Sequence, residues 1–191
     1  MAGAALLEDP AVLKQVHRFT IEEYHRLGER GEIGERTELI EGVIINKMPK
    51  SPLHVYLIET IRVILEAILA TEFIVRQEQP ITIKALESEP EPDISVIRGR
   101  REDFLTGHPQ TAELVVEVAV TSLSLDRAKL RGYALAGVRE CWIIRTDTKA
   151  AEIYSNPQGD DYTTRSVVPL EGSLEVYGTH IALKSIFPQA D

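Results

Sequence analysis

Two acidic residues in the middle of the chain have the type and placement of ligands to a divalent metal. Asp93 follows a proline at the start of an apolar segment, and Glu117 lies inside the otherwise apolar run 114–118. An unpaired charge is costly inside a buried strand, so packing alone does not explain Glu117. Carboxylate oxygens suit Mg²⁺ and Mn²⁺. We therefore expect Asp93 and Glu117 to hold such an ion; the alternative for Glu117 is an exposed strand end or a structural ion pair.

A lysine follows these acids on an expected helix. Asp126, Lys129 and Tyr133 are spaced so that all three side chains share one helical face. An ammonium near metal-bound carboxylates can position or deprotonate a water, or stabilise charge on a phosphate. The acids and the lysine together predict chemistry on phosphodiester bonds. The alternative is a solvated lysine paired with Asp126.

Apolar patterning places these residues on a strand–strand–helix–strand unit. We expect strands over 93–97, 114–118 and 140–145, with a helix over 125–136 between the last two. The second strand has the composition of a strand buried on both faces, so its pairing with the third should be parallel. Apolar residues at helical spacing predict a long helix over 53–69, which should cover one face of the sheet.

Shorter elements surround this unit. Thr20 and Glu23 have the form of a capping box, which predicts a short helix that Gly28 ends. Strands over 37–40 and 43–46 should form a hairpin. Further short strands are expected over 73–77, 81–84, 151–154, 162–168 and 174–176, with turns at 156–157 and 159, and a last helical turn over 183–187.

Length and composition fit one soluble domain. We expect residues 17–191 to form that domain and residues 1–16 to be a loosely held tail. No run approaches the ~18 apolar residues of a membrane-spanning helix, so no membrane contact is expected. The lone Cys141 excludes an internal disulfide and fits a reducing cytoplasm. A net charge of -9 argues against a broad, nonspecific nucleic-acid surface but allows a local basic groove.

Six short motifs follow one another between residues 18 and 155. They are Glu-Leu-Ile-Glu-Gly at 38–42, Ser-Pro-Leu-His at 51–54, Pro-Asp at 92–93, Val-Val-Glu-Val at 115–118, Asp-Arg-Ala-Lys at 126–129 and Ala-Gly-Val-Arg-Glu-Cys-Trp at 136–142. This ordered set resembles the Uma-two family, a large group of bacterial proteins. That family is similar to the PD-(D/E)xK restriction-endonuclease-like superfamily.

The resemblance implies an α/β fold with a restriction-endonuclease-like core. In such a core a mixed sheet is flanked by helices, here with extra antiparallel strands at the C-terminus, and a metal site lies at a strand end. By position, Asp93 and Glu117 are the two site acids and Glu38 resembles the family's N-terminal acid. Two residues after Glu117 stands Ala119, where the superfamily pattern has a lysine. The Uma-two family has its lysine on the following helix, at the position of Lys129.

Glu41 and His54 are further candidates for this site. Glu41 is a rival of Glu38, but strand alternation places Glu38 and Ile40 on one face and turns Glu41 elsewhere. His54 begins the long helix, where its imidazole could contact a phosphate or a water. The alternative is a histidine that only hydrogen-bonds the loop. The other histidines show no ligand spacing, so a zinc site is not expected.

Arginines follow the Pro-Asp strand and flank the lysine. They are Arg98, Arg100, Arg101, Arg127 and Arg131. Guanidinium forks suit phosphates, so the five could form a basic rim around an acidic metal site. The alternative is a set of ordinary solvated side chains.

Three functions remain open from the sequence. The first is a Mg²⁺-dependent endonuclease that acts on DNA through Glu38, Asp93, Glu117 and Lys129. The second is a non-catalytic binding or assembly protein on the same fold, which the acidic pI of about 5.1 and the missing strand lysine favour. The third is a hydrolase of small phosphate esters. A homodimer is an option, because nucleases of the superfamily that cut both strands often work as dimers.

Overall fold

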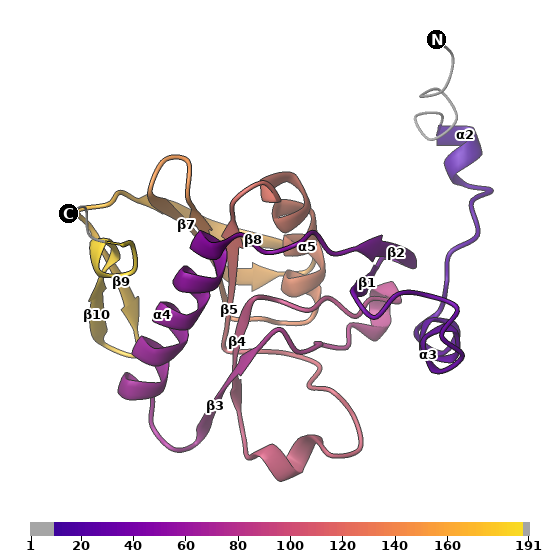
Figure 1. Cartoon of the computed structure of the whole chain (residues 1–191), viewed down its shortest axis with the longest axis horizontal. Helices are drawn as coiled ribbons and strands as arrows, with labels where there is room; N and C mark the ends of the chain where they lie inside the picture. Colours follow the sequence, from indigo (N-terminus) through magenta and orange to yellow (C-terminus); the bar gives the residue numbers. More distant parts are fainter. Residues whose placement is uncertain (1–9, 189–191) are drawn as a thin grey trace.

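A six-stranded mixed sheet lies at the centre of the computed structural model, which describes residues 10–188 (Figure 1). Its strand order is β3-β4-β5-β6-β7-β8. The bounds are Phe73–Gln77 for β3, Ile94–Arg98 for β4, Leu114–Ala119 for β5, Glu140–Arg145 for β6, Ala150–Gln158 for β7 and Asp161–Val168 for β8. Strands β5 and β6 pair in parallel, and the other described neighbours pair antiparallel. The expected order of the three central strands is confirmed.

Strand β5 is buried along its whole length because its two faces pack into different cores. Val116 and Val118 belong to the core that includes helix α4 (Pro52–Ile68), whereas Val115 belongs to the core that includes helix α5 (Leu123–Leu135). The two helices therefore cover opposite faces of the sheet. Alternation along the strand then turns Glu117 toward α5, which carries the lysine.

Helix α4 begins at a capped turn beside the sheet. The hydroxyl of Ser51 accepts a hydrogen bond from the backbone N–H of His54 at 3.2 Å, and Pro52 occupies the first turn. One helical stripe is buried, comprising Leu57, Ile58, Ile61 and Leu65. The capped start fixes both His54 and the loop that precedes the helix.

A hairpin separate from the main sheet carries the N-terminal acid. Strand β1 (Thr37–Ile40) pairs with β2 (Val43–Asn46), and a single bridge from Leu39 to Glu89 joins the hairpin to the segment before β4. Glu38 faces Ile45 in this register. The hairpin thus brings Glu38 from far upstream to Lys129, beside Glu117 of the central strand β5.

The turn of this hairpin requires glycine. Glu41 and Gly42 have φ angles of 48° and 73°, as expected for a two-residue hairpin turn in which both central residues are left-handed. A Cβ at Gly42 would lie 2.6 Å from Cβ of Arg18. A larger residue at Gly42 would therefore displace the hairpin.

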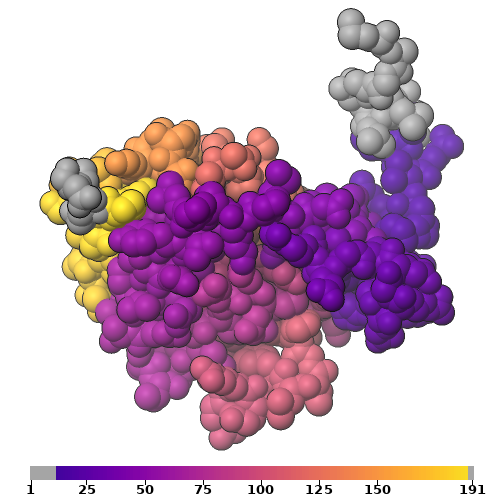
Figure 2. All heavy atoms as spheres, viewed as in Figure 1, coloured from indigo at the N-terminus to yellow at the C-terminus, as the bar shows by residue number. Residues whose placement is uncertain are grey.

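The remaining elements lie at the two ends of the chain and in the connections. They are α2 (Pro10–Leu13), α3 (Ile21–Glu29), the 3₁₀ turns η1 (Lys84–Leu86), η2 (Arg101–Phe104) and η3 (Leu183–Ser185), and the hairpin of β9 (Ser173–Val176) and β10 (Thr179–Ala182). Figure 2 shows the N-terminal half of the chain, indigo to purple, covering much of one face. Of the tail expected over 1–16, residues 1–9 lie outside the described residues.

Three local predictions are wrong. Residues 81–84 form no strand. Ile81 and Ile83 are buried as in a strand, but their N–H groups donate to the carbonyls of Pro90 and Ser88 and not to a neighbouring strand. Gly28 does not end α3, since one glycine weakens a helix without breaking it. The expected turn at 156–157 lies within β7, and the chain reverses after Gln158.

Candidate metal and phosphate site

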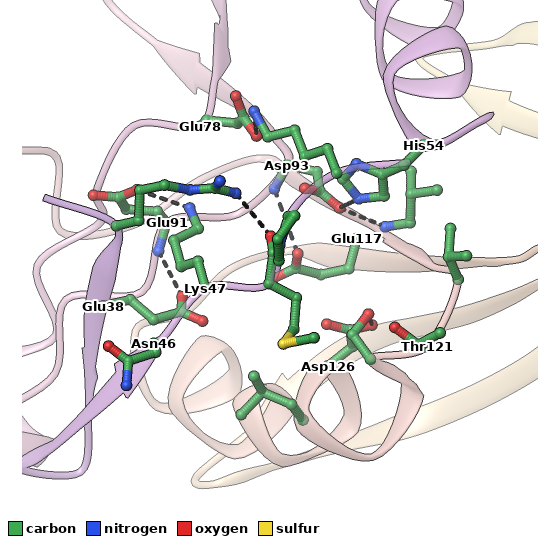
Figure 3. A pocket seen from close by; sticks show the side chains of 18 of the residues that line it. Glu38, Asn46, Lys47, His54, Glu78, Glu91, Asp93, Glu117, Thr121 and Asp126 are labelled. Atoms are coloured by element: carbon green, nitrogen blue, oxygen red, sulfur yellow. Dashed lines mark hydrogen bonds and ion pairs between the residues drawn. The ribbon is translucent and has the colours of Figure 1, made fainter. Parts of the chain in front are cut away.

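Strands β4 and β5 bring Asp93 and Glu117 side by side. Ile94 pairs with Val116, so Asp93 and Glu117 stand one residue farther along the same antiparallel register. The N–H of Val118 donates to Oδ2 of Asp93 at 2.7 Å, and the N–H of Asp93 lies 3.4 Å from Oε2 of Glu117. Both side chains line a cavity of about 420 Å³ (Figure 3). Their carboxylates therefore face one space.

Lys129 is buried between two acids. Its Nζ lies 3.0 Å from Oε2 of Glu38 and 3.3 Å from Oε1 of Glu117, and the lysine is only 6% exposed. The hydroxyl of Tyr133 donates to the same oxygen of Glu117 at 2.7 Å. Asp126 instead accepts from the hydroxyl of Ser122 at 2.6 Å. The interpretation of Lys129 as a solvated lysine is therefore wrong.

Glu38 and Glu41, the two candidates for the N-terminal site acid, have different environments in the structure. Glu38 is 2% exposed and accepts a hydrogen bond from the N–H of Glu91 at 3.1 Å in addition to its pair with Lys129. Glu41 lies in the hairpin turn and pairs with Arg131 at 2.8 Å. Glu38 lines the cavity and Glu41 does not.

Burial dominates the electrostatics of the acids. It raises the pKa of Glu117 to about 8, with Lys129 opposing the shift and Asp93 adding to it. Burial also raises the pKa of Asp126 to about 6, although the hydrogen bond from Ser122 lowers that pKa. Burial alone would lower the pKa of Lys129, but Glu117 and Glu38 outweigh it and raise that pKa. The group holds more acids than one lysine can neutralise, which favours an additional cation.

Comparisons with known proteins identify the family of this chain. The sequence model of the Uma2 family, described as "Putative restriction endonuclease", matches residues 21–183. The chain belongs to the Uma2 family. This confirms the resemblance to the Uma-two family. Because the match spans most of the chain, the motifs noted in the sequence all fall within it.

A solved structure shares this fold. A crystal structure of a "putative nuclease" from Anabaena variabilis superimposes with a TM-score of 0.74 at 19% sequence identity, covering 88% of this chain and 97% of that one. The likeness confirms the mixed α/β fold. No curated protein matches the chain. Within residues 10–188, no helix of this Uma2 protein has the length and apolar character needed to cross a bilayer.

The oxygen ligands of the candidate site suit a hard cation that keeps much of its water. Among the described residues, no three His, Cys, Asp or Glu side chains are grouped so as to hold a metal ion. Mg²⁺ is nevertheless commonly held by one or two carboxylates together with waters and substrate phosphates. Asp93 and Glu117 supply two such carboxylates on one cavity wall. These residues therefore fit Mg²⁺ or Mn²⁺ in their chemistry.

His54 also faces the cavity of the Uma2 protein. Its Nε2 lies 3.2 Å from Oδ2 of Asp93, and its Nδ1 is buried without a hydrogen-bond partner among the described residues. The hydrogen bond to Asp93 raises the pKa of His54, although burial opposes this shift. The imidazole thus orients Asp93 from the α4 side, opposite Lys129 on α5.

The basic rim that the sequence left open as one option does not form. Arg98 pairs with Glu113, Arg127 with Glu152, and Arg131 with Glu41 and Asp160. None of the five arginines lines the cavity. Their chain positions are close to the site acids, but Arg98, Arg127 and Arg131 pair with acids outside the cavity.

Sequence reasoning missed the cations that do line the cavity beside Lys129. They are Arg36, Lys47 and Lys50. Lys47 lies 2.8 Å from Oε2 of Glu91, and Lys50 pairs with Glu78. The available signal was the Lys-Met-Pro-Lys sequence at 47–50, two basic residues around a rigid proline just before a helix.

Proposed function

We propose that this Uma2 protein is a Mg²⁺- or Mn²⁺-dependent endonuclease that hydrolyses phosphodiester bonds in DNA. The observation that best supports this proposal is the burial of Lys129 between Glu38 and Glu117, in the cavity that Asp93 also lines. A buried lysine shared by two acids is expensive unless geometry holds every partner in place. Family membership supports the same reaction class, and the absence of disulfides fits a cytoplasmic protein.

Each residue would have a separate task. Asp93 and Glu117 would hold the ion, which when bound supplies a Lewis acid and a water of lowered pKa. The ammonium of Lys129 would donate hydrogen bonds to a phosphate oxygen or orient the attacking water. Glu38 would keep that ammonium in position from the hairpin side. Since a duplex has two strands, a homodimer would place one site on each.

The decisive experiment is Glu117→Gln. We expect wild type to bind Mn²⁺ in calorimetry and to nick or cut plasmid DNA, with EDTA stopping the reaction. Glu117→Gln is nearly isosteric and removes the ligand charge, so binding and cleavage should both fall to background. Glu175→Gln is the matched control, because Glu175 is exposed on β9 outside the cavity.

Two outcomes would contradict this proposal. Cleavage that survives in Glu117→Gln would show that the activity does not need this carboxylate, and a contaminating nuclease would then be its source. Wild type that binds Mn²⁺ but cuts neither duplex nor single-stranded DNA or RNA would favour the second candidate, a non-catalytic binding protein. That candidate is supported by Lys129, whose ammonium pairs with Glu38 and Glu117 within the fold.

A further inference from the structure

We infer that the loop of residues 47–51, between β2 and α4, is the wall of the cavity that holds the sugar–phosphate backbone of the nucleic acid. Lys47 and Lys50 are its phosphate contacts. This inference rests on the proposed function and assigns the substrate-binding side of that same site.

The cavity has three of its four lysine and arginine side chains on one wall, where Lys47 pairs with Glu91 and Lys50 with Glu78. Its acids include Glu38, Asp93, Glu117 and Asp126, and its most buried cation, Lys129, is already shared by two of them. A polyanion can approach only where positive charge remains available. The other three cations that line the cavity, Arg36, Lys47 and Lys50, all come from the hairpin and the 47–51 loop. The opposite wall contributes the hydroxyls of Thr121 and Ser122 together with Asp126, as Figure 3 shows for Thr121 and Asp126.

The 47–51 loop is held in shape before any ligand arrives. A guanidinium N–H of Arg36 donates to the carbonyl of Met48 at 2.8 Å, and the N–H of Lys47 donates to the carbonyl of Arg36 at 2.9 Å. At the other end, the Ser51 cap anchors the loop to α4. Arg36 is therefore a positioning residue, and the two lysines project from a fixed backbone. Preorganisation of this kind lowers the entropic cost of binding.

The partners of the two lysines can be exchanged for phosphate. In the Lys47–Glu91 pair the side chains are 21% and 25% exposed, and in the Lys50–Glu78 pair they are 34% and 19% exposed. Ion pairs that solvent reaches contribute less to stability than fully buried ones. The side chain of Lys129 is only 5% exposed and pairs with two acids, so it is far less accessible to a ligand. A phosphate that approaches Lys47 or Lys50 meets an ammonium that solvent already reaches, so the contact needs no change in the core.

The tip of the loop adds an apolar contact. Met48 lies between the two lysines in sequence and is 74% exposed. An exposed, flexible thioether side chain beside phosphate contacts is suited to packing on a sugar or a base edge. The loop therefore combines charge for the backbone with one apolar group for its inner side.

The test measures how DNA binding depends on salt. The parent is the Glu117→Gln protein in EDTA, which cannot cut, and the probe is a fluorescently labelled DNA duplex of about 20 base pairs followed by anisotropy. Each phosphate contact contributes about -0.9 to the slope of log K against log salt concentration. We expect Lys47→Ala/Lys50→Ala to make that slope shallower by about 2. Lys47→Arg/Lys50→Arg should keep the parent slope, which shows that charge and not folding is responsible.

The charge-matched control is Arg100→Ala/Arg101→Ala. Both arginines are exposed beyond β4 and outside the cavity, so the slope should not change. Equal slopes for the lysine and arginine double variants, with the parent binding DNA, would overturn the inference and leave the nuclease proposal standing. A wild type that neither binds nor cuts DNA would overturn both.

Discussion

Two sets of lysine–carboxylate contacts line one cavity and differ in almost every physical respect. Lys129 comes from a helix of the core, is nearly inaccessible and is shared by Glu38 and Glu117. Lys47 and Lys50 come from a loop, remain partly hydrated and have one carboxylate each. The difference teaches that the same pair of residue types can form part of the fold in one place and an exchangeable contact in another, because desolvation decides how strongly the partners depend on each other.

Removal of the buried lysine should give the largest effect. Lys129→Ala leaves Glu38 and Glu117 facing each other without a cation, so we expect the free energy of unfolding to fall by about 3–5 kcal/mol. Denaturant titration at pH 9, where Glu117 is ionised, measures this. Lys129→Ala should still bind Mn²⁺ in calorimetry. Its rate of DNA cleavage should fall by a factor on the order of 10²–10⁴. A stability loss near zero would show that the two sets of contacts do not differ.

The pH dependence of stability sharpens the comparison further. The pKa of Glu117 is raised from its usual value to about 8 by burial, so the folded protein binds this proton more tightly than the unfolded chain does. The stabilisation that comes from protonated Glu117 is fully present below about pH 4.5 and is lost as the pH rises through 8. We expect the free energy of unfolding, measured without metal, to decline over this window. Glu117→Gln should flatten the decline, and an equally steep decline in that variant would contradict the assignment.

Removal of a loop lysine should give the smallest effect. Because the Lys47–Glu91 pair is partly hydrated, Lys47→Ala should change the free energy of unfolding by less than about 1 kcal/mol. Thermal or denaturant unfolding beside Lys129→Ala provides the direct contrast. A loss comparable to that of Lys129→Ala would mean that the 47–51 loop is part of the core rather than a binding element.

The sequence was informative wherever short-range pattern decides the structure. The apolar run of β5, the stripe on α4 and the helical spacing of Lys129 each depend on neighbours within a few residues, and each element formed as expected. Glu117 was identifiable because an acid inside a run of valines demands partners. Those partners, Lys129 and Tyr133, lie on the helix that follows, which a periodicity argument can reach.

The sequence failed where a contact joins distant segments or where distance along a strand matters. Arg98 follows Asp93 closely in sequence, but β4 advances about 3.3 Å per residue, so the two lie at opposite ends of the strand, about 16 Å apart. The position of Lys47 and Lys50 depends on the contact of Arg36 with Met48, and no local pattern encodes it. In segment 81–84 apolar and polar residues alternate as in a strand, and Ile81 and Ile83 are indeed buried. No strand lies beside the segment to pair with it.

The separate hairpin of β1 and β2 has a consequence for native-state fluctuations. It forms its own two-stranded sheet and meets the rest of the chain through the bridge from Leu39 to Glu89, through two backbone hydrogen bonds of Gly42, and through side chains. It supplies Glu38 and leads directly into the 47–51 loop, so both would leave the cavity together if this unit opened as one foldon. Amide protons of β1 and β2 should then exchange with solvent sooner than those of β5 and β6. One acid of the candidate site and the two loop lysines would thus leave the cavity in a subglobal opening that keeps the central sheet intact.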